Sequence, residues 1–231
     1  SATYNATGQP VTDLQAAVGR LGHELVRSVA VSFAIAQIRH SVKHPGLQPQ
    51  LQELWRRSTL VAGCCHVLAR DAKLANPDEA LVTGLLHDIG RLYIVTRAHV
   101  RADEYSKSGQ WDEMLDDWHP QIGRSILEHW RFPDAIIEAI AEQNSSDRPR
   151  GLAGALHDVL VCSIALVPCV RHREMLDGTI GAVPAFQRLG FDAARWREVL
   201  AGPAQQIKQL RGALAGRAAR AGRPGRAPRR A

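Results

Sequence analysis

His87 and Asp88 are adjacent at the end of an apolar segment, and their side chains are those in this sequence best suited to chemistry. The segment runs Leu81-Val-Thr-Gly-Leu-Leu-His-Asp-Ile-Gly-Arg-Leu92. An imidazole and a carboxylate are both good ligands for a divalent metal ion. Burying either group without a partner is costly, so we expect each of them to have one.

The elements that must position this pair are predicted to be helices. A capping box at Thr12–Gln15 opens a short helix, and Gly22 either ends it or joins it to a longer helix near residues 23–40. Asn76 and Pro77 are typical of a helix start, and the helix they open leads to His87. Further helices are expected at 50–73, 91–98, 112–117, 119–130, 133–144, 152–170, 182–189, 192–200 and 203–215. No alternating strand pattern and no fixed repeat occurs, so the sequence predicts an all-α fold.

Composition excludes several classes of protein. The chain has 231 residues, 45% of them hydrophobic and 23% charged, which is enough apolar material for a core. No run of 18 apolar residues occurs, so we expect no membrane span. The first residues lack the pattern of a secretion signal, and the missing initiator Met indicates a processed or partial chain. The cysteines form no CxxC pair, which favours reduced, largely buried thiols and a cytoplasmic location.

The positive charge is concentrated at the C-terminus. The net charge is +6, but eight basic residues and no acidic ones lie from Lys208 onward, so residues 1–207 carry a net charge of −2. The last residues, 216–231, are built from Gly, Ala, Pro and Arg, and we expect them to be a disordered basic tail. Such a tail only weakly suggests a nucleic-acid partner, since it lacks interleaved aromatic residues.

The string GLLHDIGRL resembles the core motif of the HD superfamily of helical, metal-dependent phosphohydrolases. Other stretches narrow the resemblance to the HDOD subgroup, the HD-related output domains of bacterial signalling proteins. They are residues 11–22, Leu54-Trp-Arg-Arg-Ser58, and Trp118-His-Pro-Gln-Ile-Gly123 with the Leu-Glu-x-Trp and Phe-Pro-Asp that follow it. The resemblance implies an HD-domain-like helical bundle over about residues 1–175, without the family's N-terminal helices. We expect residues 176–215 to form a helical extension packed on it.

The resemblance also implies a set of metal ligands, of which this chain keeps only some. HD enzymes bind metal through a first His, the His-Asp pair and a distal Asp, and enlarged sites add further histidines. His87, Asp88 and His119 are retained, whereas Arg57 stands at the position of the first His. The site is therefore predicted to be vestigial.

The remaining ligand positions are also altered. The histidine pair expected after the next helix is replaced by Glu142-Gln143-Asn144. The distal Asp falls near Ser163, with Asp158 as the alternative if the alignment shifts by five residues.

An arginine has no lone pair with which to bind a metal ion, and it stays protonated. We therefore expect the Arg57 guanidinium to take the place of the metal and to pair with Asp88.

Two functions follow from these substitutions. The first is a non-catalytic regulatory output module of bacterial signal transduction, without a cofactor, which acts on a protein partner or an attached sensor domain. The alternative is a metal-dependent phosphohydrolase acting on a nucleotide or cyclic dinucleotide, with Mn, Fe or Zn bound by the retained ligands. The sequence favours the non-catalytic module over an enzyme.

Trp55, Trp118 and Trp130 are three of the five tryptophans, and we expect them to pack in the core or at an interface.

Overall fold

The computed structural model describes residues 45–98, 111–145, 153–170, 172–190, 194, 196 and 197, and these form helices and turns without a strand. The all-α fold class predicted from the sequence is confirmed. The helices are η2 (Pro45–Leu47), α3 (Gln48–Ala72), α4 (Pro77–Leu86), α5 (Ile89–Ala98), α7 (Trp111–His129), α8 (Asp134–Ala141), α9 (Ala153–Cys169), η4 (Arg173–Met175), α10 (Leu176–Ala182) and α11 (Pro184–Arg188). The helices expected at 23–40 and 203–215, and the tail 216–231, lie outside the described residues.

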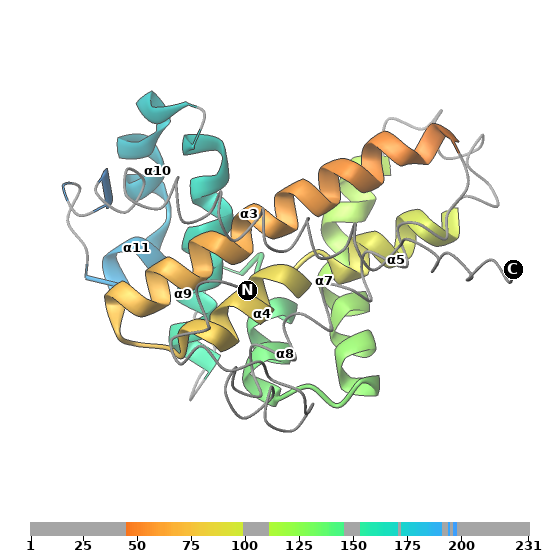
Figure 1. The fold of residues 1–231 in the computed structure, drawn as a ribbon, viewed down its shortest axis with the longest axis horizontal. Coiled ribbons are helices and arrows are strands. Elements are labelled where there is room, and N and C mark those ends of the chain that lie inside the picture. Colours follow the sequence, from red (N-terminus) through yellow and green to blue (C-terminus); the bar gives the residue numbers. More distant parts are fainter. Residues whose placement is uncertain are drawn as a thin grey trace, which may run out of the picture.

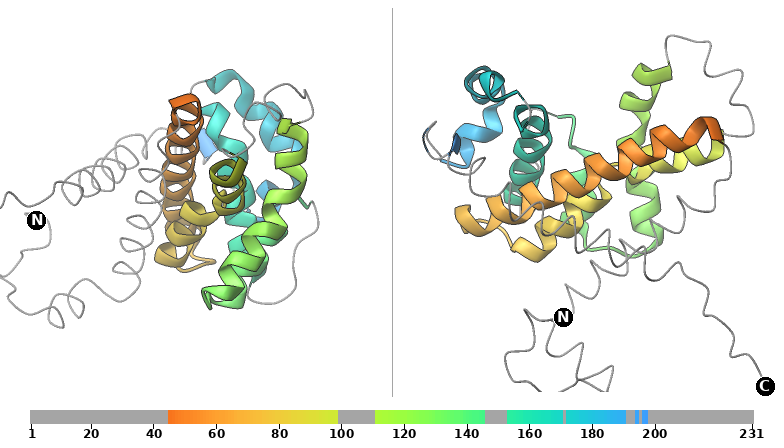
Figure 2. Two further views of the ribbon diagram at one scale, coloured as in Figure 1. Left: turned by 90° about the vertical axis from the view of Figure 1, so that its right-hand side faces the viewer. Right: turned by 45° about the horizontal axis from the view of Figure 1, so that its top comes forward.

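Helix α3 runs across the whole molecule and organises the packing (Figure 1). Its second half packs on α4 and α9, while its first turns lie against α5. Seen from the end in Figure 2, α5 lies between α3 and α7. Helices α10 and α11 pack on α9 at the opposite end of the molecule.

The start of α4 has the local structure that the sequence predicts. Asn76 is the N-cap, and its side-chain oxygen accepts hydrogen bonds from the backbone N–H groups of Asp78 (2.9 Å) and Glu79 (3.4 Å). Pro77 occupies the first helical position, where no N–H group is needed. This cap fixes the beginning of the helix that ends at the His-Asp pair.

Helix α7 corrects one expectation. The sequence predicts two helices, 112–117 and 119–130, with a break at His119-Pro120, but α7 continues through Pro120 without a break. Proline removes the N–H group that would bond to the carbonyl oxygen four residues earlier, which here belongs to Asp116. The Asn144 side chain donates to that oxygen at 2.9 Å and so compensates for the missing bond.

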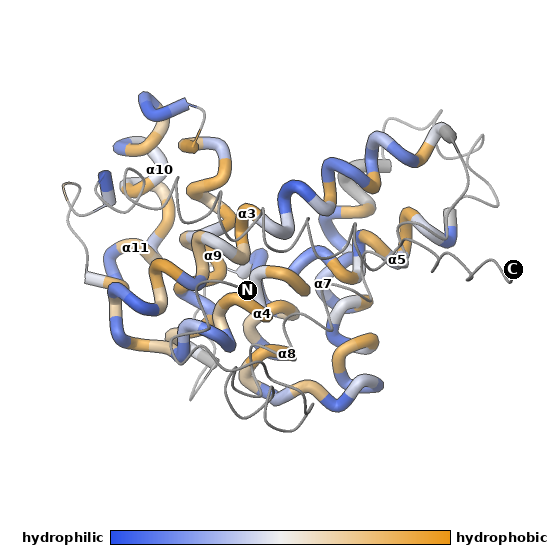
Figure 3. The backbone as a smooth tube through the Cα atoms, in the orientation of Figure 1, coloured by the Kyte–Doolittle hydropathy of each residue, from blue (hydrophilic) through white to orange (hydrophobic). Residues whose placement is uncertain are grey.

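The core lies where the helices cross. Hydrophobic residues dominate α4 and α8, whereas hydrophilic and hydrophobic residues alternate along α3 (Figure 3). Near the C-terminal end, Phe186 of α11 is fully buried and packs edge-to-face on Trp196 at 4.6 Å between ring centroids. Trp118 does not contribute to the core, because its side chain is 64% exposed. No described helix is both long enough and apolar enough to cross a membrane.

The helix expected at 182–189 is present as α11, and α10, which the sequence did not predict, precedes it. Helix α10 ends at Ala182, and Pro184 begins α11. Val183 between them is extended, with φ −113° and ψ 109°, as a residue before proline prefers. The chain therefore turns at this point instead of continuing as one helix.

Two glycines on either side of the His-Asp pair allow neighbouring helices to approach closely. A Cβ atom on Gly84 would lie 2.6 Å from the Cα atom of Ala62 in α3. A Cβ atom on Gly90 would lie 2.0 Å from the carbonyl oxygen of His119 and 2.8 Å from the backbone nitrogen of Gly123, both in α7. The motif around His87 thus fixes the spacing of α4 from α3 and of α5 from α7.

We predict that Gly90→Ala destabilises the protein strongly. The added methyl group overlaps backbone atoms that cannot move without displacing α7, so the free energy of unfolding should fall by about 3 kcal/mol, the scale of overpacking in a core. Urea denaturation followed by circular dichroism measures this. Gly178→Ala is the matched control. It meets no atom within 4 Å in α10, so it should leave stability unchanged or raise it by up to about 1 kcal/mol. Equal stability of the two variants would contradict the proposed close contact.

Candidate functional site

The Asp88 carboxylate is the centre of the site. Its side chain is 1% exposed and lies between three groups that carry or can carry positive charge. Asp88 Oδ2 is 3.2 Å from His87 Nε2 and 3.4 Å from Arg57 Nε, and Oδ1 is 3.4 Å from Arg91 Nε. The ion pair between Arg57 and Asp88 that the sequence predicts is therefore present.

These charges determine the ionisation of Asp88. Burial alone would raise the pKa of its carboxyl group, because the charged form loses its hydration. The neighbouring His87, Arg57 and Arg91 side chains outweigh that effect and hold the pKa of Asp88 well below its ordinary value. Asp88 is thus a buried, permanently negative charge at neutral pH.

His87 is oriented by its own helix. It follows the last residue of α4, and its Nδ1 donates to the carbonyl oxygen of Gly84 at 2.7 Å. This bond turns Nε2 toward Asp88. A backbone carbonyl that fixes one imidazole nitrogen is also how metal-binding histidines are oriented.

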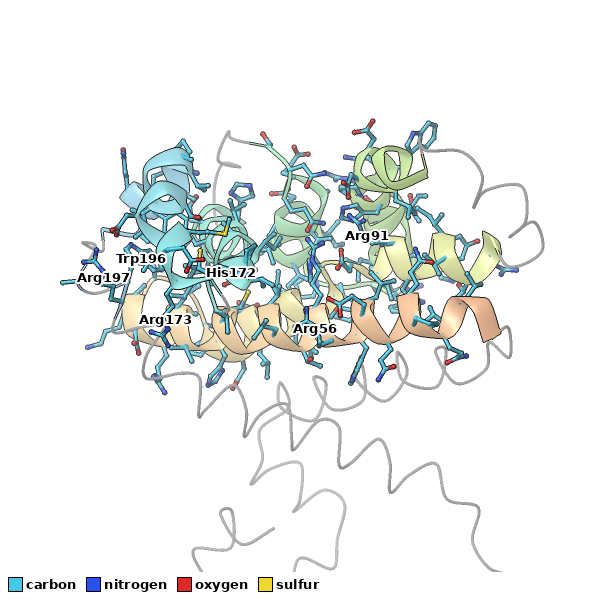
Figure 4. All side chains as sticks on the ribbon, turned by 90° about the horizontal axis from the view of Figure 1, so that it is seen from above. Arg56, Arg91, His172, Arg173, Trp196 and Arg197 are labelled. Carbon is cyan, nitrogen blue, oxygen red and sulfur yellow. The ribbon has the colours of Figure 1, made fainter. Side chains whose placement is uncertain are left out.

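Arg91 links the site to α7. It lies in the first turn of α5, three residues after Asp88, which brings the two side chains to the same side of the chain. It also forms an ion pair with Asp116 of α7. In Figure 4, Arg91 lies beside α7, while Arg56, which pairs with Glu53, lies on α3. The ion pairs run in sequence from Arg57 through Asp88 and Arg91 to Asp116, and they connect α3, α5 and α7.

His119 of α7 completes the buried cluster. Its side chain is buried, and its Nδ1 has no hydrogen-bond partner among the described residues. Burial lowers the pKa of His119 to about 4; nearby Asp88 acts in the opposite direction, and Arg91 reinforces the effect of burial. His119 is therefore neutral at pH 7.

The three residues that follow α8, Glu142 to Asn144, hold neighbouring helices together. Gln143 donates from Nε2 to the backbone oxygen of His87 at 2.9 Å, and Asn144 donates to that of Asp116. The Glu142 carboxylate lies 3.4 Å from Arg124, and its backbone oxygen accepts from His157 Nε2 at 3.0 Å. Each of the three residues makes a cross-link between elements.

The two candidates for the distal Asp position are engaged elsewhere. Asp158 is buried and pairs with Arg188 of α11, whose Nη2 and Nε lie 2.8 and 2.9 Å from Oδ1. Ser163 is buried, and its hydroxyl donates to the backbone oxygen of Val159 at 2.7 Å. Neither residue joins His87 and Asp88 in a group of ligands, and the described residues contain no cluster of three or more His, Cys, Asp or Glu able to hold a metal ion.

These contacts bear on whether the site fits the divalent metal that the resemblance implies. His87 Nε2, both Asp88 oxygens and His119 Nδ1 lack hydrogen-bond partners in the described structure and could act as ligands. However, the one carboxylate among them already has two guanidinium groups within 3.4 Å. A divalent cation beside Asp88 would face both of these fixed positive charges at short range. The donor set therefore does not fit a resident divalent metal ion.

Arg91 and Asp116 are the site residues that sequence reasoning missed. A signal for Arg91 was present, because an arginine three residues after an aspartate on a helix brings the two charges together. For Asp116 the sequence carried no such signal, since it reaches the site through the packing of α7 on α5.

The fold and the His-Asp pair at the junction of α4 and α5 define a helical protein of the HD-domain type. The family model described as HDOD domain matches residues 1–146, and the chain belongs to the HDOD family.

Solved structures share this fold. One is a candidate metal-dependent phosphohydrolase from Shewanella amazonensis SB2B, with a TM-score of 0.63 and 21% identity over 91% of this chain and 76% of the other. Another is an HDOD domain protein of unknown function from Geobacter sulfurreducens, with a TM-score of 0.60 and 22% identity over 93% of this chain and 77% of the other. A comparison with curated protein sequences found no match.

We predict that stability falls as the pH drops from about 6.5 to about 4. The unfolded chain binds a proton at His119 with the ordinary pKa of 6.5, whereas the folded protein does so only near pH 4. In this window the unfolded state holds more protons, so acid favours unfolding. At about 1.36 kcal/mol per pKa unit, the loss is on the order of 3 kcal/mol.

Urea midpoints measured between pH 4 and pH 7.5 test this prediction. His119→Gln should flatten the profile, because the titrating group is gone. His172→Gln, at an exposed histidine, is the control and should keep the wild-type profile. A wild-type slope retained in His119→Gln would show that another group causes it.

Proposed function

We propose that this protein is a non-catalytic regulatory output module of bacterial signal transduction that acts through contacts with other proteins. The observation that carries the proposal is the position of Arg57, whose Nε lies 3.4 Å from Asp88 Oδ2 where the family has a metal ligand. A metal-activated water requires first a bound metal, and an internal cation competes directly for the carboxylate that would bind it.

A second observation supports the non-catalytic module: the residues that the resemblance aligns with further metal ligands make structural contacts here. Gln143 and Asn144 donate hydrogen bonds that connect the end of α8 to the His87 turn and to α7. Ligands of a catalytic metal must leave an open coordination position for substrate or water. Gln143 and Asn144 use their side chains to connect helices, and this supports a rigid module that acts through its surface.

A metal-dependent phosphohydrolase is the competing function. It is favoured by buried polar atoms of His87, Asp88 and His119 that have no hydrogen-bond partner in the described structure. It is also favoured by the name of the Shewanella amazonensis protein with the same fold. Metal content separates the two functions, because the phosphohydrolase needs a bound metal.

We predict that the purified protein retains far less than one metal ion per chain, both as isolated and after incubation with Mn²⁺, Fe²⁺ or Zn²⁺ followed by desalting. Elemental analysis gives the content, and hydrolysis of bis(p-nitrophenyl) phosphate gives the activity. Arg57→His supplies an imidazole and removes a positive charge, so its metal content should rise several-fold. The matched control is Arg56→His, because Arg56 lies next to Arg57 but pairs with Glu53 and should not affect metal binding.

Two results would contradict the proposal. Near-stoichiometric metal together with hydrolysis in the wild type would establish the phosphohydrolase. Equal metal content in wild type and Arg57→His would show that Arg57 is not the residue that excludes the metal.

A further inference from the structure

An open apolar groove lies between α5 and α7, separate from the charge network. Its volume is about 410 Å³, and its walls and floor are mostly aliphatic and aromatic. The residues that line it are Ile89, Leu92, Tyr93 and Thr96 of α5, and Ile122, Ser125, Ile126, His129 and Trp130 of α7 and its C-terminal turn.

Two large side chains that line this groove are partly exposed, because the described residues do not cover them. Tyr93 is 45% exposed and Trp130 is 41% exposed. On each wall the lining residues recur every three or four positions, which places them on one helix face. Two helix faces that form such a trough suit a third amphipathic helix laid along it.

The described chain begins near this part of the molecule. The first turns of α3 lie on α5, where Leu51 and Trp55 line a small cavity together with Leu92. Figures 1 and 2 both show the beginning of α3 at the same end of the molecule as α5. The described chain thus begins, at Pro45, close to α5, and 44 residues precede it in the sequence.

The sequence of residues 23–40 supplies an apolar face of matching character. Leu25, Val29, Phe33 and Ala36 follow one another at spacings of three or four residues, so they share one side of a helix. From Leu25 to Ala36 this side is about 16 Å long at 1.5 Å per residue. The lining of the groove covers residues 89–96 on one wall and 122–130 on the other, about 10–12 Å at the same rise.

We propose that residues 23–40 dock as a helix in the groove between α5 and α7, with Val29 and Phe33 covering Tyr93 and Trp130. The HDOD family model matches residues 1–146 as one unit, so the segment and both walls of the groove belong to the same domain. A domain buries its apolar helix faces against one another. The groove is then an internal docking surface for the chain's own N-terminal segment.

Limited trypsin digestion of the full chain tests this docking through the bond after Arg27, which lies inside the segment. A docked helix must open before trypsin can cleave it, so this bond should be protected in the wild type. Tyr93→Glu and Trp130→Glu each place a charge in the groove, and cleavage at Arg27 should become at least ten-fold faster. Mass spectrometry identifies the fragments, and circular dichroism checks that the helices remain.

The matched control is Leu74→Glu. Leu74 is 52% exposed and lies between α3 and α4, outside the groove, so this variant should keep the wild-type cleavage rate. Equal rates at Arg27 in wild type, Tyr93→Glu and Trp130→Glu would overturn the proposal.

A second copy of the chain is the other occupant that the experiment must identify. Light scattering across a concentration series measures the mass of each variant. A dimeric wild type that becomes monomeric in Tyr93→Glu, with unchanged cleavage at Arg27, would assign the groove to a partner copy and overturn the docking of residues 23–40. A mass that does not differ between the variants, together with faster cleavage at Arg27, supports intramolecular docking.

Discussion

The structure depends on how it accommodates the buried negative charge of Asp88. An isolated carboxylate in a protein interior costs several kcal/mol, and it is tolerated only with partners of opposite charge. Here the partners come from different elements, because Arg57 belongs to α3 and Arg91 to α5. Arg91 then carries the network to Asp116 of α7. Compensating the charge thus requires α3, α5 and α7 to keep their relative positions.

The glycines of the motif make this arrangement sterically possible. Gly84 lets α4 approach α3, and Gly90 lets α5 approach the carbonyl oxygen of His119 in α7. Asn144 bonds to the carbonyl oxygen that Pro120 leaves free, so α7 stays continuous while it carries His119 into the site. Charge compensation and close backbone packing therefore constrain the same few helices.

Sequence reasoning found the parts of the site that obey local rules. The N-cap at Asn76 and the helix that leads to His87 follow from residue types and short spacings. The pairing of Arg57 with Asp88 follows from the family resemblance, which aligns Arg57 with the first His. It failed at Pro120, because the residue that compensates the proline, Asn144, lies 24 positions away in the chain and on another element. Asp116 was missed for the same reason, and so was the pairing of Asp158 with Arg188, which depends on α11 folding back onto α9. The roles of His87, Asp88 and His119 as remnants of a metal site remain a prediction.

Helix α5 takes part in both the charge network and the apolar groove. Ile89 and Leu92 line the groove, and they also line the small cavity that reaches Asp88. One side of α5 is therefore held by ion pairs to α3 and α7, while another side forms a wall of the groove. Because Gly90 leaves no space between α5 and α7, this helix cannot shift toward α7 to fill the groove itself. The close backbone contact at Gly90 thus keeps the groove open, and filling it requires a segment from outside the two helices.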